Sequence, residues 1–463
     1  MKVSHRFVEG SAKFDENNIV SCAGLVPVMT LAQETRLQEL ITQKVSVEAS
    51  KVASGAANPA PKLATLIAGM CAGADSIDDV NILRSGGMKH LFGNVYAPST
   101  VGTLMRELTF GHNRQLESVL RDHVVELADR VEILPGLTEL AFIDIDSLLR
   151  PVYGHGKQGA SYRHTKIAGK QLLRKGLSPL ATTITTAGSA PVLAGMRLRA
   201  GKAGSGKGAG RMVTQAINTA RMAGASGMIL VRGDSAYGNS SVVGACRRKG
   251  VEFSVVMVKN TAVQHAIDTI SDDAWTPVHY PGAVRDPDNG GWISDAEVAE
   301  TTYTAFSSTN KPVTARLIVR RVKALPRCVV PGLAVSPLLH QHHTADDDRR
   351  CHPPRARHHR NRLRGSDRWT TRTPALGPLR GQRRMDPLRR DRPQPARAAG
   401  IPAGDQHSRA RGATLRRRLV NVAARLTRPQ RRPVLRLPTH WPWSSAWLRL
   451  WTNTIGHSPP ATA

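Results

Sequence analysis

The sequence predicts a mixed α/β fold: a mixed sheet with flanking helices, preceded by an all-helical N-terminal region and followed by a disordered Arg/Pro-rich tail. Three observations support this expectation. Apolar residues recur at helical spacing between about 34 and 135, two later apolar strands each end in an aspartate, and the composition changes abruptly after residue 323. We therefore expect a mostly helical region over 1–135, an α/β core over 136–323 and a tail over 324–463.

The overall composition limits the class of protein. The chain has 463 residues, of which 40% are hydrophobic, enough to bury a sizeable core and too many for a disordered or collagen-like chain. No apolar run reaches the ~18 residues of a membrane span, so we expect no membrane partner. The five cysteines form no CxxC pair, which favours a cytoplasmic location over secretion. The formal net charge of +30 favours nucleic acid as a partner.

The N-terminal region is predicted to be a series of helices. Residues 19–32 are as apolar as a signal peptide, but acidic residues precede them, so we expect a buried strand that leads into a helix. Helical spacing follows over 37–45 and 63–70, a helix start lies at Pro98, and 113–131 form an amphipathic helix. This region is interpreted either as a DNA-binding or dimerisation domain, which would make a homodimer, or as a generic bundle.

The α/β core carries acidic residues at the ends of two predicted strands. Residues 137–145 predict a strand whose end carries Asp144 and Asp146, and residues 227–231 predict a second strand that leads to Asp234. Between and after these strands we expect a hairpin over 180–186 and 192–198, helices over 211–223 and 241–249, and a strand over 253–258.

A single aspartate after a strand is usually a helix cap or a turn former, but two strands that each deliver a carboxylate are more informative. Adjacent strands would bring the like charges together, which is costly unless a cation lies between them. Mg²⁺ prefers such oxygen ligands, and two bridged metal ions can activate the attacking group and stabilise the leaving oxygen of a phosphodiester. Basic residues that could hold the phosphates are Lys157, Arg163, Lys166 and Lys170.

The strings FIDIDS (142–147), PVYG (151–154), KQGA (157–160) and RGDSAY (232–237) resemble those of bacterial insertion-sequence transposases of the DDE type. The resemblance implies an RNase H-like catalytic core that uses Mg²⁺ or Mn²⁺ to cleave and join DNA at the terminal inverted repeats of its element. It implies a first catalytic, metal-binding acid at Asp146 or Asp144, and a second at Asp234. It also implies a polar insertion from about residue 259, in which Trp292 either stacks on an extruded base or packs in the interior.

Residues 201–208, with the sequence GKAGSGKG, nearly match a phosphate-binding loop. Gly208, however, stands where Ser or Thr would bind Mg²⁺. We therefore interpret this segment as a flexible basic loop that touches the DNA backbone or nothing.

The tail has an unusual composition. Residues 324–463 contain 28 Arg, 7 Asp, no Lys and no Glu, a net charge of +21. One interpretation is a genuine Arg-rich tail of a non-catalytic nucleic-acid-binding protein. The other is a GC-rich gene read out of frame, which would produce Arg and Pro while Lys and Glu vanish. The four tail tryptophans, at 441, 443, 447 and 451, are then expected to pack poorly.

The frameshift interpretation can be examined by back-translating the sequence and shifting the reading frame by one base. The family's third acid is a Glu, but no Glu follows Glu300. Codons for HHRNRLRGSD (358–367) can be chosen so that a shift of one base reads IIETVFADL, which supplies a Glu across Arg360 and Asn361. We therefore expect a frameshifted pseudogene product that lacks its third metal ligand and is inactive in DNA transposition and recombination.

Overall fold

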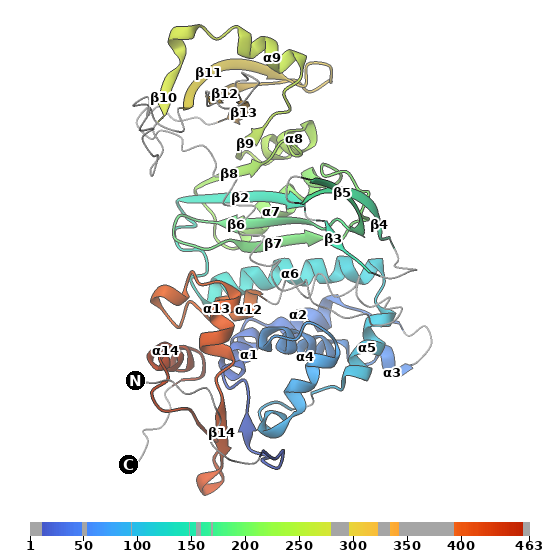
Figure 1. The fold of residues 1–463 in the computed structure, drawn as a ribbon, viewed down its shortest axis with the longest axis vertical. Coiled ribbons are helices and arrows are strands. Elements are labelled where there is room, and N and C mark those ends of the chain that lie inside the picture. The colour runs from blue at the N-terminus through green and yellow to red at the C-terminus, as the bar shows by residue number, and fades with distance from the viewer. Residues whose placement is uncertain are drawn as a thin grey trace.

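The computed structural model describes residues 12–48, 53–93, 95–147, 149–153, 159–167, 170–278, 296–322, 334–341 and 393–456. Figure 1 shows an elongated molecule with a large sheet across its middle. The N-terminal helices and the C-terminal elements lie together on one side of this sheet, and a β-rich extension lies on the other. Among the described residues we find no helical segment with the length and apolar character of a bilayer span.

The N-terminal region consists of helices behind one short strand, β1 (Ile19–Val20). Apolar residues of these helices form one continuous core with those of the central sheet. The last and longest helix packs on strand β7 and on α2, so it joins the helical region to the sheet. The helices are α1 (Leu25–Glu34), α2 (Leu37–Lys44), α3 (Ala53–Ala56), α4 (Pro59–Ala72), the 3-10 helices η1 (Asp78–Arg84) and η2 (Gly86–His90), α5 (Pro98–Glu107) and α6 (Phe110–Arg130).

The central sheet is mixed. Five of its strands run in the order β7-β6-β2-β8-β9, in which β6 is antiparallel to both β2 and β7, whereas β2, β8 and β9 are mutually parallel. Parallel neighbours require crossover connections, and α7 and α8 provide them. The elements are β2 (Leu140–Ser147), β6 (Leu180–Thr185), β7 (Val192–Arg197), α7 (Ala209–Met222), β8 (Met228–Gly233), α8 (Ser240–Arg248) and β9 (Glu252–Val256).

The same sheet continues beyond β9 through four antiparallel strands in the order β13-β12-β11-β10. Strand β13 belongs to the region expected to be a disordered tail, yet it lies between β9 and β12, and its Leu339 is fully buried. The elements of this extension are α9 (Thr261–Asp268), η3 (Asp272–Ala274), β10 (Thr276–Val278), β11 (Ala296–Ala305), β12 (Val313–Val322) and β13 (Ala334–Gln341).

A small antiparallel sheet lies at the edge of the core next to the end of β2. Its strand order is β3-β5-β4, so β5 is the central strand. The strands are β3 (Arg150–Pro151), β4 (Ser161–Ile167) and β5 (Lys170–Leu177).

Residues 393–456, called here the C-terminal module, are ordered, so the expectation of a disordered tail is wrong for this segment. The module packs on α1 and α4, and its strand β14 pairs with β1. The physical reason is that its apolar residues fill the N-terminal core while most of its arginines stay at the surface. The elements are α12 (Pro393–Ala398), η6 (Asp405–His407), α13 (Gly412–Leu415), the π-helical turn η7 (Arg416–Val420), β14 (Ala424–Thr427), η8 (Pro429–Arg431), β15 (Val434–Arg436) and α14 (Ser444–Ile455).

The contacts between the two ends of the chain are close and specific. Arg416 is buried and donates to the carbonyl oxygens of Met70 and Cys71 at the end of α4. A Cβ atom on Gly24 would lie only 1.8 Å from the carbonyl oxygen of Leu419, so glycine is required at that contact. The C-terminal module is therefore fitted to the N-terminal helices.

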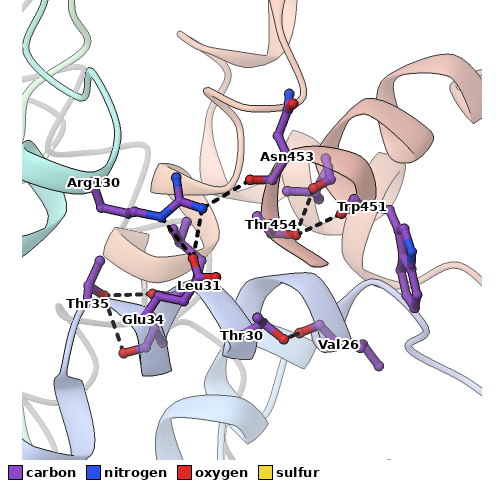
Figure 2. Close-up of polar contacts among 11 residues, drawn as sticks. Val26, Thr30, Leu31, Glu34, Thr35, Arg130, Trp451, Asn453 and Thr454 are labelled. Carbon is purple, nitrogen blue, oxygen red and sulfur yellow. Dashed lines mark hydrogen bonds and ion pairs between the residues drawn. The ribbon is translucent and has the colours of Figure 1, made fainter. Parts of the chain in front are cut away.

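Helix α14 completes this contact (Figure 2). Arg130, at the end of α6, donates from Nη2 to the carbonyl oxygen of Asn453 (3.2 Å) and from Nε to Glu34 of α1 (3.0 Å). Trp447 is 3% exposed, so the expectation that the tail tryptophans pack poorly is wrong for this residue. Trp451 stacks on Trp447 with ring centroids 5.3 Å apart.

Candidate active site

Asp146 and Asp234 come together because of the register of two parallel strands. Strand β2 pairs with β8 so that Ile145 lies opposite Gly233. Asp146 follows Ile145 and Asp234 follows Gly233, so the two acids come at the same level of the sheet. Asp146 is half-buried and Asp234 is exposed. Two carboxylates therefore lie at the same edge of the sheet, where β2 and β8 both end.

Asp144, the other candidate for the first acid, has a different environment. It lies opposite Arg232 on β8 and accepts two hydrogen bonds from it, Nε to Oδ1 at 2.8 Å and Nη2 to Oδ2 at 2.9 Å. Asp144 is 8% exposed, and the Arg232 guanidinium lies 4.3 Å from the centroid of the Phe142 ring. Asp144 is thus held in a charge-neutralised pair inside the sheet, two residues before Asp146.

Tyr237, three residues after Asp234, is buried close enough to both carboxylates to feel their charges. It is 1% exposed, and burial raises the pKa of its phenol, with the charges of Asp146 and Asp234 acting in the same direction. The two carboxylates therefore lie near one hydroxyl group, although they come from strands 88 residues apart. Gly233 makes this packing possible, because a Cβ atom there would lie 2.8 Å from Cβ of Tyr237.

Local turns fix both carboxylates. Oδ1 of Asp146 accepts the backbone N–H of Ser147 (2.6 Å), and Oδ1 of Asp234 accepts that of Ala236 (2.9 Å). The turn after Asp234 then leads into α8, which Asn239 caps by accepting the N–H groups of Ser241 and Val242. The orientation of each acid is therefore set by its own backbone.

The basic segment 201–208, called here the glycine loop, lies beside these acids. The hydroxyl of Ser205 is 3.3 Å from that of Ser147, the neighbour of Asp146. Arg199 holds the loop, donating from Nη1 to the carbonyl oxygens of Gly204 (3.1 Å), Ser205 (3.0 Å) and Lys207 (2.8 Å). The sequence shows Arg199 as a basic residue before the loop, but its hydrogen bonds to the loop depend on three-dimensional contacts with no sequence signature.

The predicted DNA-binding residues are placed differently from one another. Arg163, on β4, donates to the carbonyl oxygen of Ala203 and to Ser205 Oγ, both at 2.9 Å, so it supports the glycine loop. Lys166 and Lys170 lie on β4 and β5 of the small sheet. Lys157 and Trp292 lie outside the described residues.

A second basic group adjoins the glycine loop on the side of α6. The Arg197 guanidinium lies beside Gly208, and Arg114, Arg121 and Arg211 are close enough to lower its pKa, although burial is the larger cause. The acid among them is Glu117, whose pKa burial raises. These arginines therefore place positive charge beside the glycine loop, and Glu117 offsets part of it through ion pairs with Arg114 and Arg197.

The donor set suits a hard divalent cation. Asp146 and Asp234 offer carboxylate oxygens at one sheet edge, the ligand type that Mg²⁺ and Mn²⁺ prefer. Within the part of the chain that the structure describes, no group of three or more His, Cys, Asp or Glu residues could hold a metal ion together. Asp146 and Asp234 are thus the two carboxylates that could hold such an ion among the candidate residues at this end of β2 and β8.

Comparison with known proteins gives one family match. A family model described as "Transposase DDE domain group 1" matches residues 3–347. No curated protein sequence matches the chain. A solved structure described as a cryo-EM structure of the piggyBac transposase synaptic complex with hairpin DNA is 11% identical to the chain. The structural alignment covers 84% of this chain and 79% of the chain in that structure, with a TM-score of 0.36.

Proposed function

The chain belongs to the transposase DDE domain group 1 family, and we propose that it derives from the transposase of a bacterial insertion sequence and is catalytically inactive in its present form. The observation that carries this proposal is the pair Asp146 and Asp234 at the ends of adjacent parallel strands. The five strands β7-β6-β2-β8-β9 would form the RNase H-like core, and the terminal inverted repeats of the element would be the DNA substrate.

Asp146 and Asp234 would hold Mg²⁺ or Mn²⁺. Asp146 is preferred over Asp144 as the first acid because Arg232 already neutralises Asp144. When bound, the metal would activate an attacking water or 3′-OH and stabilise the leaving oxygen of a phosphodiester. The glycine loop, held beside Asp146 by Arg199 and Arg163, would bind backbone phosphates of the DNA.

Catalysis would fail because the third acid is missing. A two-metal site needs ligands on both sides of the scissile phosphate. No Glu follows Glu300, and codons for residues 358–367 can be chosen so that the neighbouring frame reads IIETVFADL, which would supply the Glu expected from the family. We therefore propose a frameshift after about residue 323.

The folded C-terminal module limits the length of the shifted interval. Its buried residues Ala398, Leu415, Leu419 and Leu450 are at most 1% exposed and fit the N-terminal core. An unselected sequence rarely places so many apolar residues at such positions. The short strand β13, which lies inside the shifted interval, can still join the sheet through backbone hydrogen bonds. We therefore infer that a second, compensating shift restores the original frame by about residue 397, so that the product keeps both of its ends and loses the segment with the catalytic Glu.

A second candidate function is a nucleic-acid-binding protein without catalytic activity. The observation that favours it is again the C-terminal module, which carries 12 arginines and one aspartate on a folded framework. Both functions predict DNA binding. They differ in whether repair of the reading frame restores strand cleavage.

A plasmid excision assay on purified protein with the cognate ends distinguishes these functions. The chain as given should bind the ends without excising them in Mg²⁺ or Mn²⁺. A variant gene in which 324–396 are read in the neighbouring frame should excise, and Asp146→Asn or Asp234→Asn in that background should abolish excision. Excision by the unrepaired chain, lost on Asp234→Ala, would mean that another acid completes the site and would refute the proposed inactivity.

A further inference from the structure

A hairpin of the C-terminal module carries a dense group of arginines. Strands β14 and β15 and the turn between them, residues 424–436, are called here the arginine hairpin. The hairpin contains no acidic residue. In Figure 1 it reaches away from the rest of the molecule at the end opposite to β10–β13. Its five arginines, all exposed, are Arg425, Arg428, Arg431, Arg432 and Arg436.

The arrangement concentrates positive charge. Arg425 and Arg436 lie directly opposite each other in the antiparallel register, and like charges in such a pair are destabilising. Among the described residues, the ion pair found for these five arginines joins Arg425 to Glu16 at 3.5 Å. The charge of the hairpin is therefore largely uncompensated within the described part of the chain, which favours an anionic partner.

The hairpin is anchored to the rest of the fold by strand pairing and by a buried side chain. Its strand β14 pairs with β1, placing Arg425 opposite Ile19, and the backbone N–H of Leu426 donates to the carbonyl oxygen of Asn18 (2.9 Å). Leu426 is 5% exposed, so one face of the strand is anchored in the core. The arginines are thus presented on a fixed base, which reduces the entropy lost when they bind a partner.

We propose that the arginine hairpin binds the sugar-phosphate backbone of duplex DNA. Two-stranded ribbons fit the grooves of DNA, and the planar guanidinium matches a phosphate with two hydrogen bonds. The hairpin lies beyond residues 3–347, the part that matches the family model, and its binding uses neither metal nor catalytic acid. The proposed contact rests on the second candidate function, nucleic-acid binding by the C-terminal module, and does not depend on the catalytic site.

The test uses the full-length chain and a duplex of about 30 base pairs of arbitrary sequence, because backbone binding does not require the element's ends. In the hairpin variant, Arg428, Arg431, Arg432 and Arg436 are replaced by Gln. In the control variant, four exposed arginines elsewhere, Arg106, Arg247, Arg248 and Arg409, are replaced by Gln, so that both proteins lose the same charge. Thermal unfolding of each variant reports whether the fold is kept.

The hairpin variant should bind the duplex at least about tenfold more weakly at moderate salt. The slope of log K against log salt should fall by about 3 to 4, since each lost phosphate contact removes about 0.9. The control should stay within about threefold of the parent chain. Equal losses in the two variants would overturn the proposal, because charge alone would then explain binding. Tighter binding of single-stranded RNA of the same length, lost in the hairpin variant, would overturn the choice of DNA as partner.

Discussion

Arg232 donates two hydrogen bonds, of 2.8 and 2.9 Å, to the carboxylate of Asp144 on the neighbouring parallel strand. This pair lies two residues before Asp146 on β2 and two residues before Asp234. The side chains of Asp144 and Asp146 point to the same face of β2, so alternation along the strand cannot separate their roles. Their neighbours on β8 distinguish the two residues. Asp144 lies opposite Arg232, whereas Asp146 lies at the level of a second acid, Asp234.

Loss of the Asp144 charge should destabilise the fold. Asp144→Asn would leave the guanidinium of Arg232 in a largely buried position without its carboxylate, at a cost of about 2 to 4 kcal/mol in the free energy of unfolding. Urea unfolding measures this cost. In the double variant Asp144→Asn/Arg232→Gln part of it should be recovered. Arg36→Gln, which breaks the surface pairs with Glu39 and Glu126, should cost at most about 1 kcal/mol. Strictly additive effects of Asp144→Asn and Arg232→Gln would contradict the coupling.

Metal binding should depend on the edge acids. Mn²⁺ binding to the full chain can be measured by calorimetric titration. The affinity should fall by at least about tenfold in Asp146→Asn and in Asp234→Asn, because each substitution removes a charged oxygen ligand. Asp144→Asn, in which the altered residue faces Arg232, should bind Mn²⁺ with nearly the parent affinity. A larger loss in Asp144→Asn than in Asp146→Asn would exchange the roles of these residues.

Sequence reasoning found the strand ends but not the contacts across strands. An aspartate after an apolar run is visible in the letters, and so Asp146 and Asp234 could be proposed as site residues. The pairing of Asp144 with Arg232, and the three carbonyl groups bound by Arg199, depend on register and on the path of a loop, neither of which has a periodic signal. For the same reason the sequence predicts a flexible glycine loop, whereas Arg199 holds this loop through three hydrogen bonds.

The expectation of a wholly disordered tail is wrong because it rests on the overall composition of the tail. The positions of its apolar residues along the sequence are the relevant signal. Arginines stand between the apolar residues of the C-terminal module and hide their spacing, while Leu415, Leu419 and Val422 still point into the core. The partner of β14 is β1, some 400 residues earlier in the chain, and a contact at that separation leaves no local pattern. The short length of β1, two residues, adds to the difficulty.

The packing of the C-terminal module can be tested by truncating one buried side chain. Trp447→Ala should lower the free energy of unfolding by about 3 to 5 kcal/mol, because Trp447 is 3% exposed on α14 and the change leaves a cavity against α1. Leu448→Ala is the matched control, since Leu448 is the next residue and is 51% exposed; it should cost no more than about 0.5 kcal/mol. Equal small effects in denaturant unfolding would show that α14 does not dock.

The glycine loop should become accessible when its anchor is removed. Arg199→Gln removes the three hydrogen bonds to loop carbonyls, so trypsin should cut after Lys202 and Lys207 faster than in the parent chain by roughly tenfold or more. Arg221→Gln is the control, because it removes one exposed bond to a carbonyl oxygen, that of Lys249. Unchanged cleavage in Arg199→Gln would contradict the anchoring role.

His123 should make the fold sensitive to acid. Its ring lies fully buried on α6, and burial lowers its pKa from the ordinary 6.5 to about 4. The hydroxyl of Thr35 donates to the carbonyl oxygen of Leu31 (2.8 Å), so it accepts from Nε2 of the neutral His123 ring (3.0 Å). Protonation of the ring would therefore place a charge in the core without a new partner.

The sign of the effect follows from proton binding. Between pH 6.5 and 4 the unfolded chain holds a proton on His123 and the folded chain does not, so stability is complete above pH 6.5 and falls as the pH decreases towards 4. From pH 7 to pH 5 this residue should account for about 2 kcal/mol of the lost free energy of unfolding. Urea unfolding at both pH values, compared with His123→Gln, isolates the contribution, because Gln can still donate to Thr35 but does not titrate. If the variant loses as much stability as the parent between these pH values, acid acts on the fold through groups other than His123.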